Sequence, residues 1–214
     1  QPVALPSVSR DAARARLGLG PDEFLVCSFG MLTPAKMPER ILSAWLGSSL
    51  ARDGRCCLVF VGEDPDRRFQ EQVAQQVGES GMAGRVQVTG FAPPDRYKDW
   101  LAAADVAVQL RAMSRGETSR AILDCLAYGV PLIVNAHGSA AELTDGIAVK
   151  LDEDFRDGDL AAALERLWRD PAERARLSAA GRDHVRLHHA PGRVTKEYWE
   201  AIETWAEESV AARR

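Results

Sequence analysis

The chain has 214 residues, of which 46% are hydrophobic and 27% are charged, and its formal net charge at pH 7 is −4. This composition is that of an ordinary globular protein with one sizeable core. The weak negative charge argues against a general nucleic-acid or membrane surface, no apolar run is long enough to span a bilayer, and no signal peptide is visible. We therefore expect a cytoplasmic protein. Because the chain begins with Gln1 rather than Met, we expect a piece of a longer one.

The first 30 residues predict a linker, a helix and a strand. Residues 1–9 contain prolines and no periodic pattern, which is typical of a linker or tail. Ser9 can cap a helix over 11–17, and Gly18 can end it. An apolar run within 23–30 indicates a first buried strand.

Helices and strands are then expected to alternate. A helix that begins at Pro38 places four apolar residues on one face, namely Ile41, Leu42, Ala44 and Trp45. Later strands are expected over 57–62, 85–89, 105–110, 130–134 and 147–151, with helices over 66–78 and 96–103 and a further helix that ends at Gly129. Alternation of this kind predicts an α/β fold, a doubly wound, Rossmann-like parallel sheet of about six strands.

The C-terminal third predicts a helical tail. Apolar residues keep helical spacing over 160–168, 177–185 and 194–205, and we expect each stripe to pack on the domain. The four cysteines fall in apolar strands or a helix and form no Cys-x-x-Cys pair, so we expect buried, reduced thiols.

Ligands of an open parallel sheet bind in the loops after the strands. Here these loops are 30–36, 62–64, 90–92, 111–119 and 135–139. The sequence contains neither Gly-x-Gly-x-x-Gly after the first strand nor a Gly-Lys-Ser/Thr loop, so a bound phosphate must be held in another way. The free backbone N–H groups of 117–119, at the start of a helix, suit such an anion.

One segment carries a family resemblance. Residues 123–133 read Leu-Asp-Cys-Leu-Ala-Tyr-Gly-Val-Pro-Leu-Ile, which resembles the signature region of the family-four retaining glycosyltransferases of the GT-B fold. Gly116 stands where that family has its first acid, Glu117 follows it, and Asp124 replaces the second acid, a glutamate. After the first strand, Gly30 and Lys36 match the family pattern, but Met31 stands where an arginine is common.

The resemblance implies a site for a nucleoside-diphosphate sugar. It implies that Lys36 binds the diphosphate, and that Arg111 or Arg115 replaces the missing arginine. It also implies that Gly90 and Phe91 meet the base through backbone groups. The alternatives are a solvated loop lysine at position 36 and a plain turn with Phe91 in the core.

The acids and hydroxyls of 116–124 have two readings as well. The resemblance implies that Glu117 is the catalytic acid that faces the donor sugar, with Gly116 beside it, and that Asp124 binds the ribose hydroxyls. The alternatives are a first-turn acid at 117 and a surface acid at 124. Thr118 and Ser119 can cap the helix, touch the diphosphate, or do both.

Other polar residues are explained without catalysis. Ser139 and Glu142 match a capping box, and His137 can face a ligand from its glycine loop. The remaining histidines, at 184, 188 and 189, are expected at the surface or between helices. We expect no protein metal site, since no His-Glu-x-x-His or similar spacing occurs.

The resemblance therefore implies the C-terminal, donor-binding half of a retaining glycosyltransferase that uses a UDP or GDP sugar and no further cofactor. The acceptor, a sugar or a lipid-linked molecule, would bind mainly to a missing N-terminal domain, and the half alone would be inactive. The expected organisation is thus a linker or tail over 1–9, a Rossmann-like nucleotide-sugar-binding domain over 10–190 and a C-terminal helix over 191–214 that packs either on this domain or on a missing N-terminal domain. If the last helix crosses to that domain, its apolar stripe would be exposed here. The alternatives are a GT-B sugar-nucleotide epimerase and a non-catalytic nucleotide-binding or interaction domain.

Overall fold

A computed structural model of the chain describes residues 8–80, 82 and 84–211; most of the expected linker therefore lies outside the described residues. The strands are β1 Phe24–Phe29, β2 Cys56–Val61, β3 Val86–Val88, β4 Val106–Gln109, β5 Leu132–Asn135 and β6 Val149–Leu151. The helices are α1 Arg10–Leu17, α2 Pro38–Gly47, α3 Arg68–Ser80, α4 Pro94–Ala103, α5 Arg120–Tyr128, α6 Asp157–Arg169, α7 Pro171–His188 and α8 Pro191–Ala211. Three 3₁₀ turns are η1 Pro34–Lys36, η2 Ser49–Arg52 and η3 Gly138–Ala140.

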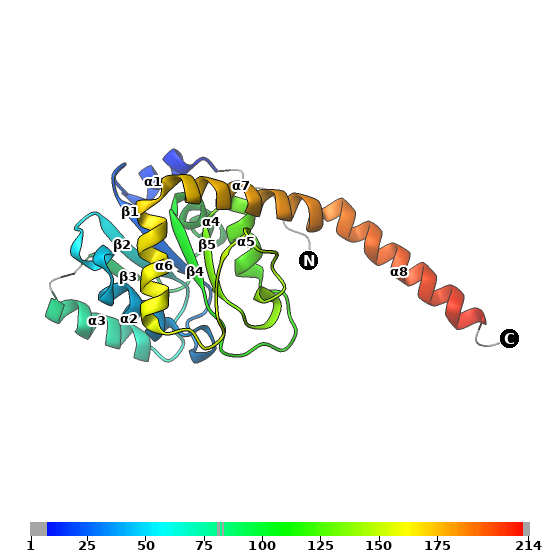
Figure 1. Cartoon of the computed structure of the whole chain (residues 1–214), viewed down its shortest axis with the longest axis horizontal. Coiled ribbons are helices and arrows are strands. Elements are labelled where there is room, and N and C mark those ends of the chain that lie inside the picture. The colour runs from blue at the N-terminus through cyan, green and yellow to red at the C-terminus, as the bar shows by residue number, and fades with distance from the viewer. Residues whose placement is uncertain (1–7, 81, 83, 212–214) are drawn as a thin grey trace.

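The six strands form one parallel sheet in the order β3-β2-β1-β4-β5-β6, and Figure 1 shows the helices around it. The order reverses between β1 and β4. In a doubly wound sheet this reversal opens a crevice at the carboxyl ends of the strands. The predicted α/β, Rossmann-like fold is confirmed.

Helices cover both faces of the sheet, because both sides of its central strands are apolar. Phe24 and Val26 of β1 pack in one core cluster with α2, α3 and α6. Leu25, Cys27 and Phe29 alternate with them and pack in a second cluster with α1, α4, α5 and α7. All four cysteines are buried and none forms a disulfide, as the sequence predicts.

Local signals place the helix ends where the sequence predicts them. The Ser9 hydroxyl accepts a hydrogen bond from the backbone N–H of Ala12, at the start of α1. Gly18 and Gly129 end α1 and α5 with φ of 73° and 67°, the left-handed region that glycine enters without strain.

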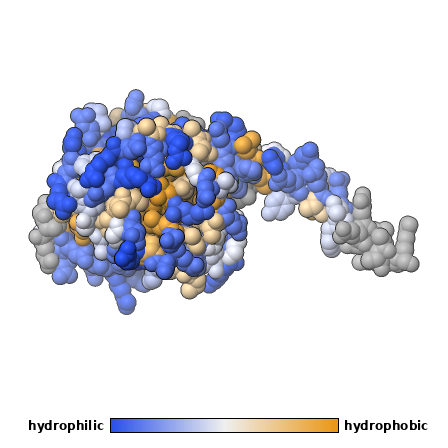
Figure 2. Space-filling view, in the orientation of Figure 1, coloured by the Kyte–Doolittle hydropathy of each residue, from blue (hydrophilic) through white to orange (hydrophobic). Residues whose placement is uncertain are grey.

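The last helix departs from the prediction that its stripe packs on the domain. Val194 is buried, but Tyr198, Ile202 and Trp205 are 68%, 57% and 69% exposed. The helix extends away from the body of the molecule, with hydrophobic side chains among hydrophilic ones (Figures 1 and 2). Packing on this domain is therefore wrong for these three residues, because other helices already cover both faces of the sheet, while packing on a missing N-terminal domain stays a prediction. None of the described helices is both long and apolar enough to cross a membrane.

Candidate functional site

The loops after β1 and β2 approach each other closely at the carboxyl edge of the sheet. A Cβ atom added to Gly62 would lie 2.1 Å from the carbonyl oxygen of Gly30, so only glycine fits there. Gly30 itself has a φ of 99°, and a Cβ on it would lie 2.1 Å from Nζ of Lys36. Gly30 therefore leaves room for the Lys36 ammonium, and Gly62 leaves room for the backbone of Gly30.

Lys36 is held inside this edge rather than in solvent. Its Nζ donates a hydrogen bond to the carbonyl oxygen of Phe29, 3.0 Å away. Burial, with a further contribution from the charge of Arg111, lowers the pKa of Lys36 to about 8. The reading of Lys36 as a fully solvated loop lysine is therefore wrong.

Arg111 brings a second cation to the same edge from the end of β4. Its Nη2 lies 3.3 Å from Oγ of Ser119, and its Nη1 lies 3.8 Å from Oε1 of Glu117. The Glu117 side chain is 50% exposed, and its other carboxylate oxygen accepts a hydrogen bond from the backbone N–H of Arg115 at 2.7 Å. That backbone bond is the main reason why the pKa of Glu117 is lowered.

Asn135 fixes Arg111, and the sequence analysis missed this role. The Asn135 side chain is at the end of β5 and its residue is 1% exposed. Its Oδ1 accepts a hydrogen bond from the backbone N–H of Arg111 and its Nδ2 donates one to the carbonyl oxygen of Arg111, both at 2.8 Å. A buried side-chain amide that hydrogen-bonds both the N–H and the C=O of one residue fixes the backbone of that residue. The direction in which the chain continues after the strand is therefore fixed at Arg111. The sequence signal that could have indicated this role is a polar residue, Asn135, at the end of an otherwise apolar strand.

Ser119 is the N-cap of α5, as predicted. Its hydroxyl accepts a hydrogen bond from the backbone N–H of Ile122 and also lies beside Arg111. Gly116 has a φ of 86°, which turns the preceding loop toward the helix, while the side chains of Arg115 and Thr118 are exposed. The start of α5, Arg111 and Lys36 thus converge on one edge.

Asp124 lies one turn into α5 and is buried, so the reading as a surface acid is wrong. Its carboxylate accepts hydrogen bonds from Nε of Arg120 at 2.7 Å and from the hydroxyl of Tyr97 at 3.3 Å. Burial raises the pKa of Tyr97, and the neighbouring Asp124 adds to that shift. These bonds account for an acid in a helix interior, where aspartate has poor propensity.

The loop after β3 presents Phe91 to solvent. Phe91 is 74% exposed, so the reading of this residue as core is wrong. Before it, the Thr89 hydroxyl accepts a hydrogen bond from the backbone N–H of Gly62 and donates one to the carbonyl oxygen of Gly90. The ends of β2 and β3 are therefore tied together, and Gly90 is held at the same edge as Gly30.

The loop after β5 differs from the sequence prediction. The expected capping box of Ser139 and Glu142 is wrong, because only the short turn η3 forms there and its N-cap, His137, makes no side-chain cap bond. His137 Nδ1 instead lies 2.6 Å from Oε1 of Glu153. Among the described residues, no three His, Cys, Asp or Glu side chains are arranged to hold a metal ion.

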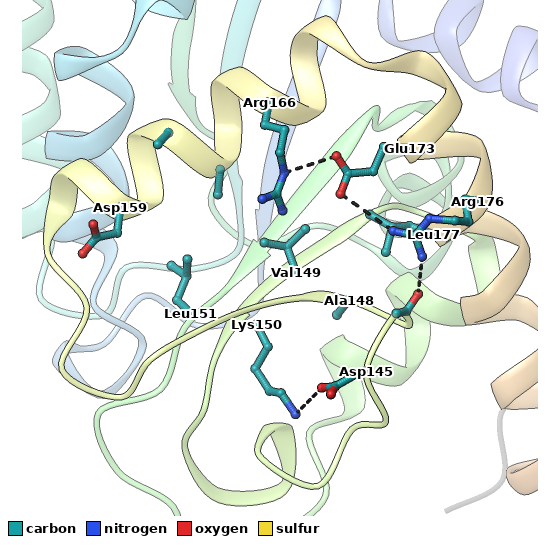
Figure 3. A pocket seen from close by; sticks show the side chains of 13 residues that line it. Asp145, Ala148, Val149, Lys150, Leu151, Asp159, Arg166, Glu173, Arg176 and Leu177 are labelled. Atoms are coloured by element: carbon teal, nitrogen blue, oxygen red, sulfur yellow. Dashed lines mark hydrogen bonds and ion pairs between the residues drawn. The ribbon is translucent and has the colours of Figure 1, made fainter.

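A cavity of about 560 Å³ lies away from this edge, between β6, α6 and α7 (Figure 3). Its charged side chains all have partners: Arg166 and Arg176 both reach Glu173, at 3.2 Å and 3.8 Å, Lys150 reaches Asp145 at 3.3 Å, and Asp159 pairs with Arg156 outside the cavity at 3.6 Å. These pairs explain the charges as structural, so we retain the carboxyl edge as the candidate site.

Comparison with known proteins decides the family. A family model described as glycosyl transferases group 1 matches residues 9–184, which include every element from α1 to β6 and the whole carboxyl edge. The chain belongs to the group 1 glycosyl transferases. This agrees with the resemblance carried by residues 123–133.

Two relatives illustrate the range of similarity. D-inositol 3-phosphate glycosyltransferase of Rhodococcus opacus (strain B4) is 33% identical over 182 residues, which are 82% of this chain and 40% of that protein. Alpha-D-kanosaminyltransferase of Streptomyces kanamyceticus is 29% identical over 171 residues, which are 79% and 42% of the two chains. The chain thus spans about two fifths of the length of these curated relatives.

Solved structures of glycosyltransferases share the fold. The C-terminal domain of LpcC, a group 1 family protein from Francisella tularensis, matches with a TM-score of 0.76 and 19% identity, over 87% of this chain and 96% of that one. Anabaena HepE, solved with UDP and glucose, matches with a TM-score of 0.77 and 18% identity, over 89% of this chain and 51% of that one. The chain therefore has the Rossmann-like fold of GT-B glycosyltransferase domains.

Proposed function

We propose that this chain is the donor-binding half of a retaining glycosyltransferase and that it binds a nucleoside-diphosphate sugar at the carboxyl edge of the sheet. The observation that carries the proposal is the pair of cations there, Lys36 and Arg111, beside the start of α5. The pKa of Lys36 is lowered partly by Arg111, so the two charges repel each other. Among the described residues, the one acid that forms an ion pair with either cation is Glu117, whose exposed carboxylate lies 3.8 Å from Arg111.

A diphosphate matches this arrangement in charge and in hydrogen bonding. Its oxygens accept bonds from an ammonium, a guanidinium and free helix N–H groups at once, and its charge offsets the repulsion between the cations. In transfer, the same groups stabilise the diphosphate as it leaves the sugar carbon. Arg111 then takes over the contact with the diphosphate that the family resemblance assigns to an arginine at the position of Met31.

The other residues follow from the same placement. Glu117 faces the donor sugar from the loop before α5, Asp124 binds the ribose hydroxyls, and Gly90 and Phe91 meet the base. Thr118 and Ser119 supply hydroxyls beside the diphosphate. Asp124 then exchanges its present partners, Tyr97 and Arg120, for hydroxyl groups. HepE was solved with UDP-glucose, so UDP is the first nucleotide to test.

The acceptor binds to another part of the whole protein. We propose that the exposed stripe of α8, which includes Tyr198, Ile202 and Trp205, packs against that part. The buried free thiols fit the reducing cytoplasm, where we place the enzyme. The chain alone binds donor without turnover.

Calorimetric titration with UDP, GDP, ADP and NAD tests the proposal. We expect one nucleoside diphosphate to bind, and Lys36→Ala and Arg111→Ala each to weaken it by about tenfold to a hundredfold, since each removes a charged hydrogen bond. Arg115→Ala is the matched control: its side chain is exposed, so a smaller loss is expected. Binding of NAD alone, or equal affinities in all variants, would overturn the proposal.

A further inference from the structure

A cavity of about 440 Å³ lies at the amino ends of β4 and β5, at the opposite edge of the sheet from the candidate site. It is enclosed by α1, the last turns of α4 and α5, and the α7 residues 174–182. The helix α5 runs from one site to the other, because Ser119 caps its start at the candidate site and Tyr128, its last residue, lines the cavity. The two sites are therefore separate.

Three arginines line this cavity from two helices. Arg10 comes from α1, whereas Arg174 and Arg182 come from α7, with Ser178 halfway between them. Residues four apart lie on the same face of a helix. Arg174, Ser178 and Arg182 therefore form one polar stripe along the α7 wall of the cavity.

The described lining contains one acid, Asp105, and that acid already has several donors. Its carboxylate accepts a hydrogen bond from Arg10 at 2.6 Å and one from the backbone N–H of Leu25 at 2.8 Å. Arg14, outside the cavity, pairs with the same carboxylate at 3.5 Å. The lining thus carries three positive charges against one shared negative charge, which favours an anion as ligand.

The two arginines of α7 have carbonyl partners but no acid. Arg174 donates through Nη1 to the carbonyl oxygens of Leu167 and Trp168, at the end of α6. Arg182 donates through Nη2 to the carbonyl oxygen of Tyr128 at 3.1 Å. Within the part of the chain that the structure describes, neither arginine forms an ion pair, and the other nitrogens of both guanidinium groups have no hydrogen-bond partner.

We propose that this cavity binds a phosphate group. A guanidinium group pairs with phosphate oxygens through two parallel hydrogen bonds, and the Ser178 hydroxyl adds a donor between the two α7 arginines. The negative charge of the phosphate offsets the excess positive charge of the lining. The proposal goes beyond the donor site, because no residue of this lining belongs to that site.

The size of the cavity favours an organic phosphate over the free anion. Its volume falls within the roughly 300–1,000 Å³ of small-molecule sites, which is more than one phosphate group fills. Leu101, Val130 and Pro131 also line it and suit the apolar part of a small molecule. The phosphate group therefore has two sources, a small organic phosphate or inorganic phosphate, which the experiment distinguishes.

The test is calorimetric titration of the whole chain at constant ionic strength. The ligands are inorganic phosphate, phenyl phosphate and glycerol 3-phosphate, with glycerol as the uncharged control. Arg182→Gln removes one guanidinium group at an exposed position. Ser178→Asp keeps every arginine and supplies an acid four residues from Arg174 and from Arg182, so it takes the place of the anion. Arg186→Gln is the matched control, since Arg186 lies on the next turn of α7, pairs with Asp183 at 3.0 Å and does not line the cavity.

We expect at least one phosphate compound to bind and glycerol not to bind. Arg182→Gln should weaken phosphate binding by about tenfold, since it removes a charged hydrogen bond, and Ser178→Asp should abolish it in a folded protein. Arg186→Gln should leave it unchanged. An ester that binds more tightly than inorganic phosphate identifies an organic phosphate as the ligand, and the reverse order identifies the free anion.

Two results overturn the proposal: no phosphate compound binds to the wild type, or binding is equal in the wild type, Arg182→Gln and Ser178→Asp. Lys36→Ala separates this cavity from the proposed donor site. Phosphate binding that is lost only in Lys36→Ala places the phosphate at the carboxyl edge and overturns the cavity proposal alone. Phosphate binding that depends on Arg182, in a chain that binds no nucleotide, removes only the donor-binding function.

Discussion

The two edges of the sheet use their charges in opposite ways. At the amino edge, Asp105 accepts bonds from Arg10 at 2.6 Å and from the backbone N–H of Leu25 at 2.8 Å, and it pairs with Arg14 at 3.5 Å. Arg14 also donates to the carbonyl oxygens of Ala103, Gly20 and Glu23. At the carboxyl edge, Lys36 donates to one carbonyl oxygen and faces another cation.

The difference separates charges that stabilise the fold from charges that, under the proposed function, bind a ligand. A buried cation with several partners ties elements together, and its loss leaves those partners unpaired. A buried cation beside a like charge costs stability, which a bound anion offsets. Substitution of a cation at the amino edge should therefore lower the stability of the fold. Substitution of Lys36 at the carboxyl edge should raise the stability of the fold and weaken nucleotide binding.

The largest effect is expected at the amino edge, for Arg14→Met. Arg14 has a side chain only 6% exposed, so its loss leaves Asp105 and three carbonyl oxygens short of a donor. We expect the free energy of unfolding in urea to fall by about 3–5 kcal/mol. Arg10→Met, at a side chain 43% exposed, should cost less than about 1 kcal/mol. A smaller loss for Arg14→Met than for Arg10→Met would contradict the comparison.

Asn135→Ala should affect both stability and affinity. It removes the two bonds that hold the backbone of Arg111, at a residue 1% exposed. We expect a loss of about 1–3 kcal/mol in the free energy of unfolding and weaker nucleotide binding, because Arg111 no longer leaves β4 in a fixed direction. Denaturation and titration of the same sample measure both. Unaltered affinity would remove Asn135 from the site.

Lys36→Met should stabilise the fold by about 1–3 kcal/mol near pH 7 while weakening nucleotide binding. The pKa of Lys36 in the folded protein, about 8, lies below the ordinary lysine value of 10.5. Below pH 8 both states carry the proton, so the folded protein bears the full cost of the buried charge. Between pH 8 and 10.5 the unfolded state binds more protons, so wild-type stability rises with pH.

The advantage of Lys36→Met should therefore shrink as pH rises above 8, and urea titrations at pH 6.5, 8 and 9.5 measure it. Nucleotide affinity of the wild type should fall through the same range as the ammonium loses its charge. A variant that is less stable than wild type at every pH would show that Lys36 is a structural cation like Arg14.

The smallest effect is expected outside both edges, for Trp205→Glu on α8. Trp205 is 69% exposed, so the free energy of unfolding should change by less than about 0.5 kcal/mol. Trp45, with 0% exposure, is the buried counterpart, and Trp45→Ala should cost about 3–5 kcal/mol. A large loss for Trp205→Glu would mean that α8 packs on the domain in solution.

The sequence predicted the sheet and its helices because their signals are local. A continuous apolar run such as 24–29 predicts a strand that is buried on both faces of the sheet. A glycine such as Gly129 predicts a helix end because it adopts the left-handed backbone conformation found there. The exposure of Trp205 was expected only if the last helix crosses to another domain, and no local signal decides whether it does. An apolar stripe predicts that one face of a helix is buried against another surface. It does not show whether that surface belongs to the same domain.

The candidate site was predicted in part, for a similar reason. The loop positions of Lys36, Arg111 and Ser119 followed from the rule that strand ends form sites. The partners of Asp124 did not, because Tyr97 comes from another helix, 27 residues away in sequence. Asn135 carried only a weak signal, since one polar residue at a strand end has many structural explanations.

The uneven placement of tryptophan gives the chain an optical property. Trp45 and Trp100 lie in the core, whereas Trp199 and Trp205 lie in water on α8, at 62% and 69% exposure. Indole emission moves to shorter wavelength when the ring leaves water. Coverage of α8 by another surface would therefore shift the fluorescence spectrum to the blue. Under the proposed function, packing of α8 against another part of the protein can therefore be followed without any label.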